Sequence, residues 1–146
     1  MLVLPHVATG TALGVLLGDP FIVIPVAVAS HFVLDSVPHW QETLAPYRPT
    51  WKTYVRIPID ITLSVAVVVF ALSLQPEQAA GILAGAIFAS IADLDVLVIA
   101  FPRLKRGLLA RYWDWHCKIQ RETSSFSGVA SQLAVVVACV AVIVAM

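Results

Sequence analysis

The sequence has few charged residues and no excess of either sign. Charged side chains make up 12% of its 146 residues, and nine Lys and Arg balance nine Asp and Glu. Soluble domains carry about twice that fraction of charged residues. A neutral chain offers no broad basic surface to a nucleic acid, so we expect no nucleic-acid partner.

Cysteine is scarce as well, and the features of a cleavable leader are missing. Cys117 and Cys139 are the two cysteines, and they lie in different surroundings, which excludes a disulfide framework. The first residues contain neither a basic region nor a small-residue cleavage site. We therefore interpret the N-terminal apolar run as a helix of the mature protein and not as a signal peptide.

Apolar residues are abundant. They make up 60% of the chain, more than a soluble globule of this length can bury, so the excess is expected to face lipid. Spanning a bilayer as a helix takes roughly 17–25 residues. Five apolar runs come near this length: residues 2–17, 21–37, 57–74, 77–101 and 129–146. We predict an all-α polytopic membrane protein with about five transmembrane helices in a single domain, residues 1–146. The first two runs are short enough to form a hairpin that does not fully cross.

Basic and aromatic residues indicate the orientation. All nine Lys and Arg, all four Trp and all three Tyr lie in or at the edge of two polar connections, residues 38–56 and 102–128. With five spans these connections fall on the same side, which the positive-inside rule makes cytoplasmic. We expect short interfacial helices there, in contact with membrane lipids. The prediction is a multi-pass inner-membrane protein with a cytoplasmic N-terminus and an external C-terminus.

Ionisable residues inside the spans are costly in lipid and therefore mark function. On the predicted topology they all lie in the cytoplasmic half, and two more histidines lie just outside the spans. The in-span residues are His6, His31, Asp35, Asp60, Asp93 and Asp95, and the flanking ones are His39 and His116. For Asp60, a local ion pair with Arg56 is the alternative to a place in the site.

Helical spacing sharpens this pattern. His31, Asp35 and His39 follow each other at steps of four, which places them along one helical stripe where neighbours can share a metal ion. Asp93 and Asp95 point about 200° apart on a regular helix, so either one of them faces away or the helix is unwound there. Unwound backbone at membrane depth requires cover by protein or a water cavity.

Small residues recur every fourth position in two of the spans. One stripe follows His6 along the first run, and the other precedes Asp93 in the fourth run. Their members are Gly10, Gly14 and Gly18 in the first, and Gly81, Gly85 and Ala89 in the second. Such stripes let helices approach closely in lipid. We expect these two helices to pack together, although the same faces suit a homo-oligomer equally well.

The candidate residues predict a divalent metal. Imidazole mixed with carboxylate suits Zn, with Mn or Fe as alternatives, and the number of donors fits one or two ions. The predicted metal ligands are His6, His31, Asp35, His39 and Asp93. Asp95 and His116 are the predicted general base or acid in the reaction.

Short motifs in the chain resemble a known family. His31, Asp35, Pro38 and His39 form an H-x-x-x-D-x-x-P-H segment that is similar to one in the LexA-binding, inner-membrane-associated hydrolases. That family also has an early histidine, a D-[IL]-D segment and a late histidine, which resemble His6, Asp93-Leu94-Asp95 and His116. The resemblance implies a metal-dependent hydrolase. Ala92 stands where the family has proline, and Val96 where a histidine often follows.

The sequence therefore predicts a membrane-embedded metal-dependent hydrolase, acting on a lipid or isoprenoid phosphate ester at the cytoplasmic leaflet. Two other classes stay open. A metal-ion or proton transporter would use the same carboxylates as a pathway, but it would also need ionisable residues in the outer half of the spans, where the sequence has none. A non-catalytic interaction module would use the polar cluster only to pack helices.

Overall fold

The computed structural model describes residues 1–41 and 51–146, apart from the side chains of Val96, Ile99 and Ala100. This part of the chain is helical, which confirms the predicted all-α class, with one isolated bridge between His39 and Glu122. The α-helices are α1 (Val3–Leu17), α2 (Pro20–Ser36), α3 (Trp51–Leu74), α4 (Ala79–Ser90), α5 (Leu97–Ala100), α6 (Gly107–Ile119) and α7 (Ser125–Ala145). Three 3₁₀ segments join them: η1 (Pro76–Gln78), η2 (Ile91–Val96) and η3 (Pro102–Leu104).

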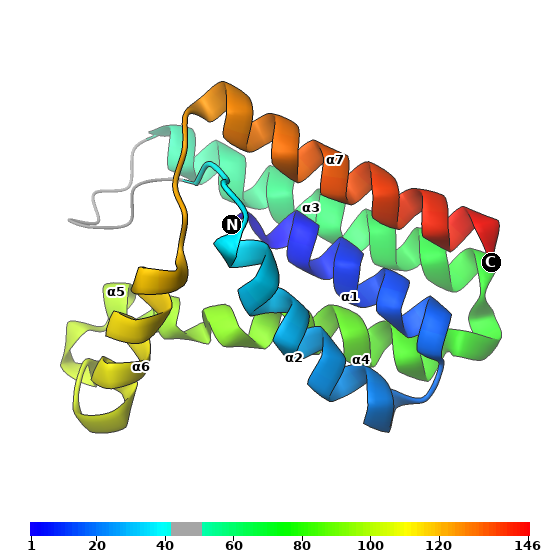
Figure 1. The fold of residues 1–146 in the computed structure, drawn as a ribbon, viewed down its shortest axis with the longest axis horizontal. Coiled ribbons are helices and arrows are strands. Elements are labelled where there is room, and N and C mark those ends of the chain that lie inside the picture. Colours follow the sequence, from blue (N-terminus) through cyan, green and yellow to red (C-terminus); the bar gives the residue numbers. More distant parts are fainter. Residues whose placement is uncertain (42–50) are drawn as a thin grey trace.

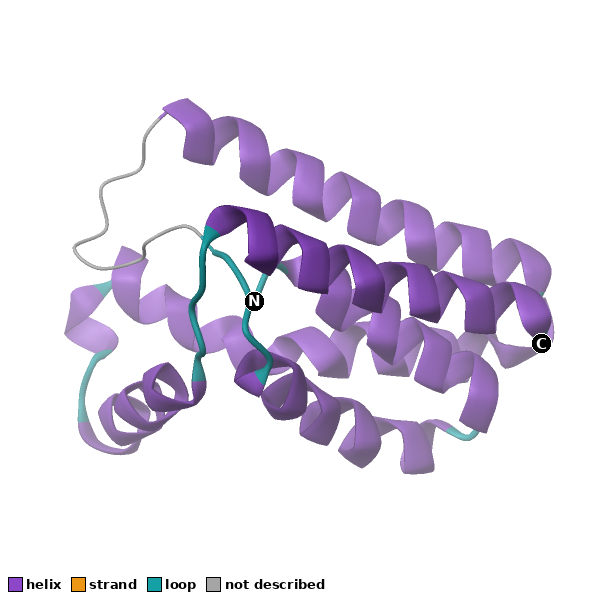
Figure 2. Cartoon of the chain, turned by 45° about the horizontal axis from the view of Figure 1, so that its top comes forward, coloured by secondary structure: helices purple, strands orange, loops and turns teal. Residues whose placement is uncertain are grey.

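Helix α1 is the centre of the molecule. It packs against α2, α3, α4 and α7, and most of its residues are buried. The bundle consists of α1, α2, α3, α4 and α7, which run roughly along one direction, with the N-terminus towards one end and the C-terminus at the other (Figure 1). Helix α6 lies to the side of the end where the chain begins (Figures 1 and 2).

Three segments are long and apolar enough to cross a membrane: Trp51–Leu74, Pro76–Asp95 and Ser125–Ala145. Large apolar side chains on them are exposed, as expected for a surface that faces lipid; Val69 is 59% and Leu133 is 60% exposed. Helices α1 and α2 are apolar but have only 15 and 17 residues. At 1.5 Å per residue they extend roughly 23 and 26 Å, less than the roughly 30 Å of a hydrocarbon core. Three of the five predicted spans are thus found as helical segments long and apolar enough to cross a membrane, and the orientation stays a prediction.

The contact between α1 and α4 uses the predicted glycine stripes. A methyl group added to Gly10 would overlap the backbone of Gly85, and one added to Gly14 would overlap that of Gly81. The two backbones therefore approach as closely as only glycine allows. This confirms the predicted packing, and these faces are occupied within the chain. Assembly into a homo-oligomer stays a prediction.

The structure also changes three predicted helix boundaries. The fourth run does not form one helix, because α4 ends at Ser90 and η2 follows. Helix α3 begins at Trp51, inside the first basic connection, whose residues 42–50 lie outside the described part of the chain. Helix α7 begins at Ser125, where the hydroxyl oxygen of Ser124 accepts a hydrogen bond from the Ser127 amide at 3.3 Å and caps the helix. The second basic connection contains the separate helix α6.

Candidate metal centre

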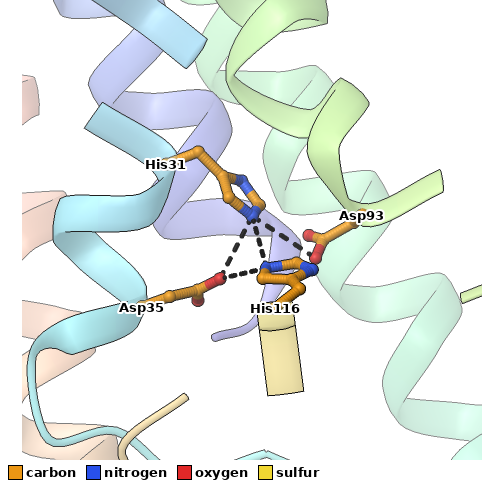
Figure 3. Close-up of side chains that lie close together, drawn as sticks. All are labelled: His31, Asp35, Asp93 and His116. Carbon is orange, nitrogen blue, oxygen red and sulfur yellow. Dashed lines mark hydrogen bonds and ion pairs between the residues drawn. The ribbon is translucent and has the colours of Figure 1, made fainter. Parts of the chain in front are cut away.

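Four side chains from three elements meet at the end of the bundle that carries α6 (Figures 1 and 3). His31 and Asp35 come from α2, Asp93 from η2 and His116 from α6. One possible ligand atom from each lies within 4.8 Å of all the others. His31, Asp35 and His116 are buried, whereas the Asp93 side chain is 31% exposed. The four residues form a candidate metal centre, called here the His₂Asp₂ cluster.

His31 and Asp35 are brought together by the helical period, which places positions four apart on one face. The His31 Nδ1 atom lies 2.7 Å from the Ala89 carbonyl oxygen, which can only accept a hydrogen bond. Nδ1 therefore carries the proton, and Nε2 presents its lone pair to the cluster, a tautomer inferred from the partner. Nε2 lies 3.1 Å from Asp35 Oδ2 and 3.6 Å from Asp93 Oδ1.

His116 reaches the cluster from α6. Its Nδ1 atom is 2.8 Å from Asp95 Oδ2, and its Nε2 atom is 2.9 Å from Asp35 Oδ2. Burial alone would lower the pKa of His116, but the hydrogen bonds with Asp35 and Asp95 outweigh it and raise the pKa to about 9. In the absence of a metal, His116 therefore holds a proton between the two carboxylates near neutral pH.

The two imidazoles fit a cation between them. Their Nε2 atoms face each other at 3.2 Å, while each Nδ1 atom points to an oxygen. With a proton on each Nδ1 atom, the two Nε2 lone pairs repel unless a proton or a metal ion lies between them. Metal-bound histidines commonly have this arrangement, with the far N–H held by a carbonyl or a carboxylate. The donor set of two imidazoles and two carboxylates therefore fits a divalent metal.

The 3₁₀ segment η2 explains why Asp93 and Asp95 both reach the site. Measured the shorter way round the axis, the two side chains are roughly 120° apart at about 3.0 residues per turn, whereas the rotation of about 200° on an α-helix leaves them roughly 160° apart. Asp93 contacts His31, and Asp95 contacts His116. The α-helix is thus interrupted here, in line with the second alternative raised by the sequence, although the backbone forms a tighter 3₁₀ segment and is not unwound.

Side chains of the site also complete the end of α4. The last carbonyls of a helix have no partner within the helix. Around this end, the Ala89 oxygen accepts a hydrogen bond from His31, and the Ala92 oxygen accepts one from Tyr112 at 2.9 Å. The break in the fourth apolar run is thus coupled to the side chains of α2 and α6.

The structure places His6 beside the cluster. His6 is fully buried on α1, and its ring stacks on that of His31 with centroids 4.0 Å apart. Its Nε2 atom lies 3.3 Å from Asp35 Oδ1, the oxygen that faces away from His116. Among the predicted metal ligands, His31, Asp35 and Asp93 belong to the His₂Asp₂ cluster, and His6 borders it.

His39 is also buried, but it is not a member of the cluster. Its Nδ1 atom donates to the Val37 carbonyl oxygen at 2.8 Å, and its Nε2 atom has no hydrogen-bond partner among the described residues. Burial lowers the pKa of His39, so that Nε2 stays unprotonated near neutral pH. Its place in the predicted ligand set stays a prediction.

Asp60 has a structural role. Its two oxygens accept hydrogen bonds from the amides of Val3 and Leu4, at 2.8 and 3.1 Å. These amides begin α1 and have no partner within that helix, so Asp60 caps α1 from α3. This contact accounts for a carboxylate within an apolar helix without placing it in the metal centre.

Two contacts to Asp35 were not predicted from the sequence. Gln120 Nε2 donates to Asp35 Oδ2 at 2.8 Å, and the Met1 amino group lies 2.7 Å from Asp35 Oδ1. Gln120 follows His116 by four residues, so the helical period was a signal for its proximity. No pattern in the sequence indicates the contact of Met1, which depends on how α1 and α2 pack.

The chain matches no protein-family model, no curated protein and no solved structure. The family resemblance therefore depends on the short motifs alone.

Proposed function

We propose that this chain is a membrane-embedded metal-dependent hydrolase that acts on a lipid or isoprenoid phosphate ester at the cytoplasmic leaflet. The observation that carries the proposal is the pair of His31 and His116 Nε2 atoms, 3.2 Å apart, with both Nδ1 atoms held by oxygens. The motifs shared with the inner-membrane hydrolases point to the same chemistry. The metal that suits these ligands best is Zn²⁺, with Mn²⁺ or Fe²⁺ as alternatives.

The proposal gives each residue of the centre a role. His31, Asp35, Asp93 and His116 hold the ion, and Asp95 orients His116 from the far side of its ring. A divalent ion in this centre lowers the pKa of a bound water and polarises a phosphoryl oxygen. Because Asp93 is the partly exposed member, water and substrate approach from its side. With His116 bound to the ion through Nε2, its Nδ1–H group donates to Asp95, so this pair positions a ligand, and the acid–base role of Asp95 and His116 stays a prediction.

The surroundings of the centre favour a lipid that carries a phosphate. The segment next to the centre is basic, with Arg103, Lys105, Arg106, Arg111 and Lys118. Large apolar side chains on the same segment are exposed, such as Leu108 at 82% and Trp115 at 48%. A helix with both kinds of residue lies at a membrane surface and attracts anionic head groups. A substrate held there has its phosphate near the His₂Asp₂ cluster and its chain in the bilayer.

The test begins with metal content, measured by elemental analysis of detergent-purified protein without a histidine tag. We expect about one or two equivalents of Zn, Mn or Fe in the wild type and none in the double variant His31→Ala, Asp35→Ala. Asp60→Asn is the matched control, because it alters a partly buried carboxylate that caps α1 and is expected to keep the metal. The wild type is then tested for phosphate release from phospholipids and isoprenoid phosphates in mixed micelles. A metal-free wild type that takes up no added metal would overturn the proposal.

A further inference from the structure

The two oxygens of Asp35 face different sets of partners. Oδ2 lies near His31, His116 and Gln120, at 3.1, 2.9 and 2.8 Å, and belongs to the His₂Asp₂ cluster. Oδ1 points to the other side, where His6 Nε2 lies at 3.3 Å. One carboxylate thus connects the two histidines of the His₂Asp₂ cluster to His6.

His6 has an unusual environment for a buried imidazole. It is 0% exposed, and within the described chain neither ring nitrogen has a hydrogen-bond partner. A buried polar group without a partner is costly and calls for an explanation, such as an ion. The His6 Nε2 atom lies 3.3 Å from Asp35 Oδ1, and a cation bound between these two atoms would give both of them a partner.

The ring geometry matches the spacing of a two-metal centre. The His6 and His31 rings are stacked, with centroids 4.0 Å apart and planes inclined by only 19°. Each ring directs Nε2 towards a different oxygen of Asp35, so two ions bound at these nitrogens would share this carboxylate. Metal ions in two-metal hydrolytic sites are about 3.5–4 Å apart, close to the separation of these rings.

The space beside Oδ1 already receives a positive charge. The Met1 amino group lies 2.7 Å from Oδ1, and it donates to the side-chain oxygens of Gln41 and Gln120, each at 3.2 Å. Carboxylate and amide oxygens that accept hydrogen bonds from an ammonium group are also ligands for divalent cations. A metal ion at this position would take over the contact of Oδ1 with the amino group.

We propose that a second divalent cation binds between His6 Nε2 and Asp35 Oδ1, so that Asp35 bridges two metals. This inference rests on the proposed function, because the first ion occupies the His₂Asp₂ cluster. Two ions clamp the attacking and the leaving oxygen of an in-line displacement, which is the usual arrangement for phosphate esters. The second site therefore favours a phosphate ester over a carboxylic ester as the substrate.

The test uses Mn²⁺ as the probe, added to metal-stripped, full-length protein in detergent. We expect about two equivalents to bind and the electron paramagnetic resonance spectrum to show two magnetically coupled ions. His6→Gln keeps a polar side chain of similar size and should reduce binding to about one equivalent, with the spectrum of an isolated ion. Thr11→Val is the matched control, because Thr11 is also fully buried on α1 and lies outside the site.

The possible results separate the second site from the first. Two coupled ions in the wild type and one uncoupled ion in His6→Gln would support the bridged centre. One uncoupled ion in the wild type would overturn the second site and leave the proposed hydrolase intact. Two coupled ions that persist in His6→Gln would also overturn the role of His6. Absence of any bound Mn²⁺, Zn²⁺ or Fe²⁺ would overturn both proposals. If His6→Gln does not fold, the wild-type spectrum alone still shows whether one ion or two coupled ions are bound.

Discussion

Asp95 contacts the side of His116 that faces away from the proposed metal. Its Oδ2 atom lies 2.8 Å from Nδ1, and a carboxylate in this position fixes the ring and makes Nε2 a stronger ligand. We predict that Asp95→Asn keeps the ring in place but weakens metal affinity by roughly 10–100-fold. Competition with a chelator of known affinity measures the change. Asp114→Asn is the control on the same helix, because Asp114 is 60% exposed and pairs with Lys105. Equal losses in both variants would refute the orienting role.

The raised pKa of His116 makes metal binding depend on pH. Asp35 and Asp95 hold the pKa at about 9, and a metal has to displace this proton before Nε2 can bind it. Between pH 6.5 and 9 we therefore expect affinity to rise by about tenfold per pH unit, the slope for release of one proton. Titrations of the metal into wild type at several pH values measure the slope. A slope of zero would show that His116 does not have to lose a proton.

The raised pKa of His116 also makes the stability of the metal-free protein depend on pH, and this stability falls as pH rises. A folded-state pKa above the unfolded value gives stability that is present below about 6.5 and is lost as pH rises through about 9. Thermal unfolding of metal-stripped protein should therefore shift to lower temperature over this range. In His116→Gln the contribution of this residue to the pH dependence should disappear, which isolates it from that of the other buried groups.

The sequence identified most residues of the centre, because the helical period alone places His31 and Asp35 on one face. It left two alternatives for Asp93 and Asp95, since the local backbone is set by tertiary contacts. It assigned His116 to the reaction, whereas the structure places its Nε2 atom among the possible ligands. That role depends on the position of α6, which no pattern within residues 107–119 determines.

At the scale of helices, the approach of α1 to α4 sets the position of His6. A methyl group at Gly10 would overlap the backbone of Gly85, and a helix backbone cannot yield as a flexible side chain does. We predict that Gly10→Ala separates the two helices and lowers the free energy of unfolding by about 1–3 kcal/mol. Thermal unfolding in detergent measures the loss. Leu16→Ala is the control on the same helix, since Leu16 is 48% exposed. Similar stability of wild type and Gly10→Ala would contradict the close contact.

Helix α6 is held to the bundle largely by residues of the site. His116 and Gln120 contact Asp35, Tyr112 donates to the Ala92 carbonyl, and the Trp115 ring packs edge-on against Phe32, 5.1 Å between centroids. Since these contacts join α6 to the metal ligands, metal binding should hold the helix in place. We predict slower amide hydrogen exchange in residues 107–119 with Zn²⁺ than without it. Exchange in α7 serves as the internal reference, and equal protection of α6 in both states would argue against this coupling.

The sequence predicted helices more reliably than it predicted their ends. Apolar length was sufficient to find α3, the fourth run and α7, and the glycine stripes were sufficient to pair α1 with α4. The sequence raised a departure from the α-helix at Asp93 and Asp95 only as one of two alternatives, and it gave no signal for the end of α4 at Ser90. The break depends on partners from elsewhere, such as Tyr112, which accounts for its absence from any local pattern.

For the whole molecule, the one-sided placement of the candidate residues was predicted from the alternation of spans and follows from the arrangement of the bundle. Helix α1 begins, α2 ends and η2 follows α4 at the same end, so each element contributes there (Figure 1). The predicted one-sided placement depends on the number of spans, because one span more or fewer would divide the histidines between two sides of the membrane. Helices α1 and α2 are too short to fix that number by length, and their packing in the bundle is what keeps the residues together.

The side of the membrane on which the centre lies is the largest remaining prediction, and a native cysteine can test it. Cys117 follows His116 on α6 and is exposed, whereas Cys139 lies within α7, one of the helices long and apolar enough to cross a membrane. If the basic connections are cytoplasmic, a membrane-impermeant maleimide should label Cys117 in inverted membrane vesicles and not in intact spheroplasts. Cys117→Ser controls for labelling at Cys139, and a cytoplasmic marker protein controls for leakage. Burial raises the pKa of Cys117, so labelling is carried out at pH 8 or above. Labelling in intact spheroplasts would place the metal centre on the outer face and change the substrate to a lipid of the outer leaflet.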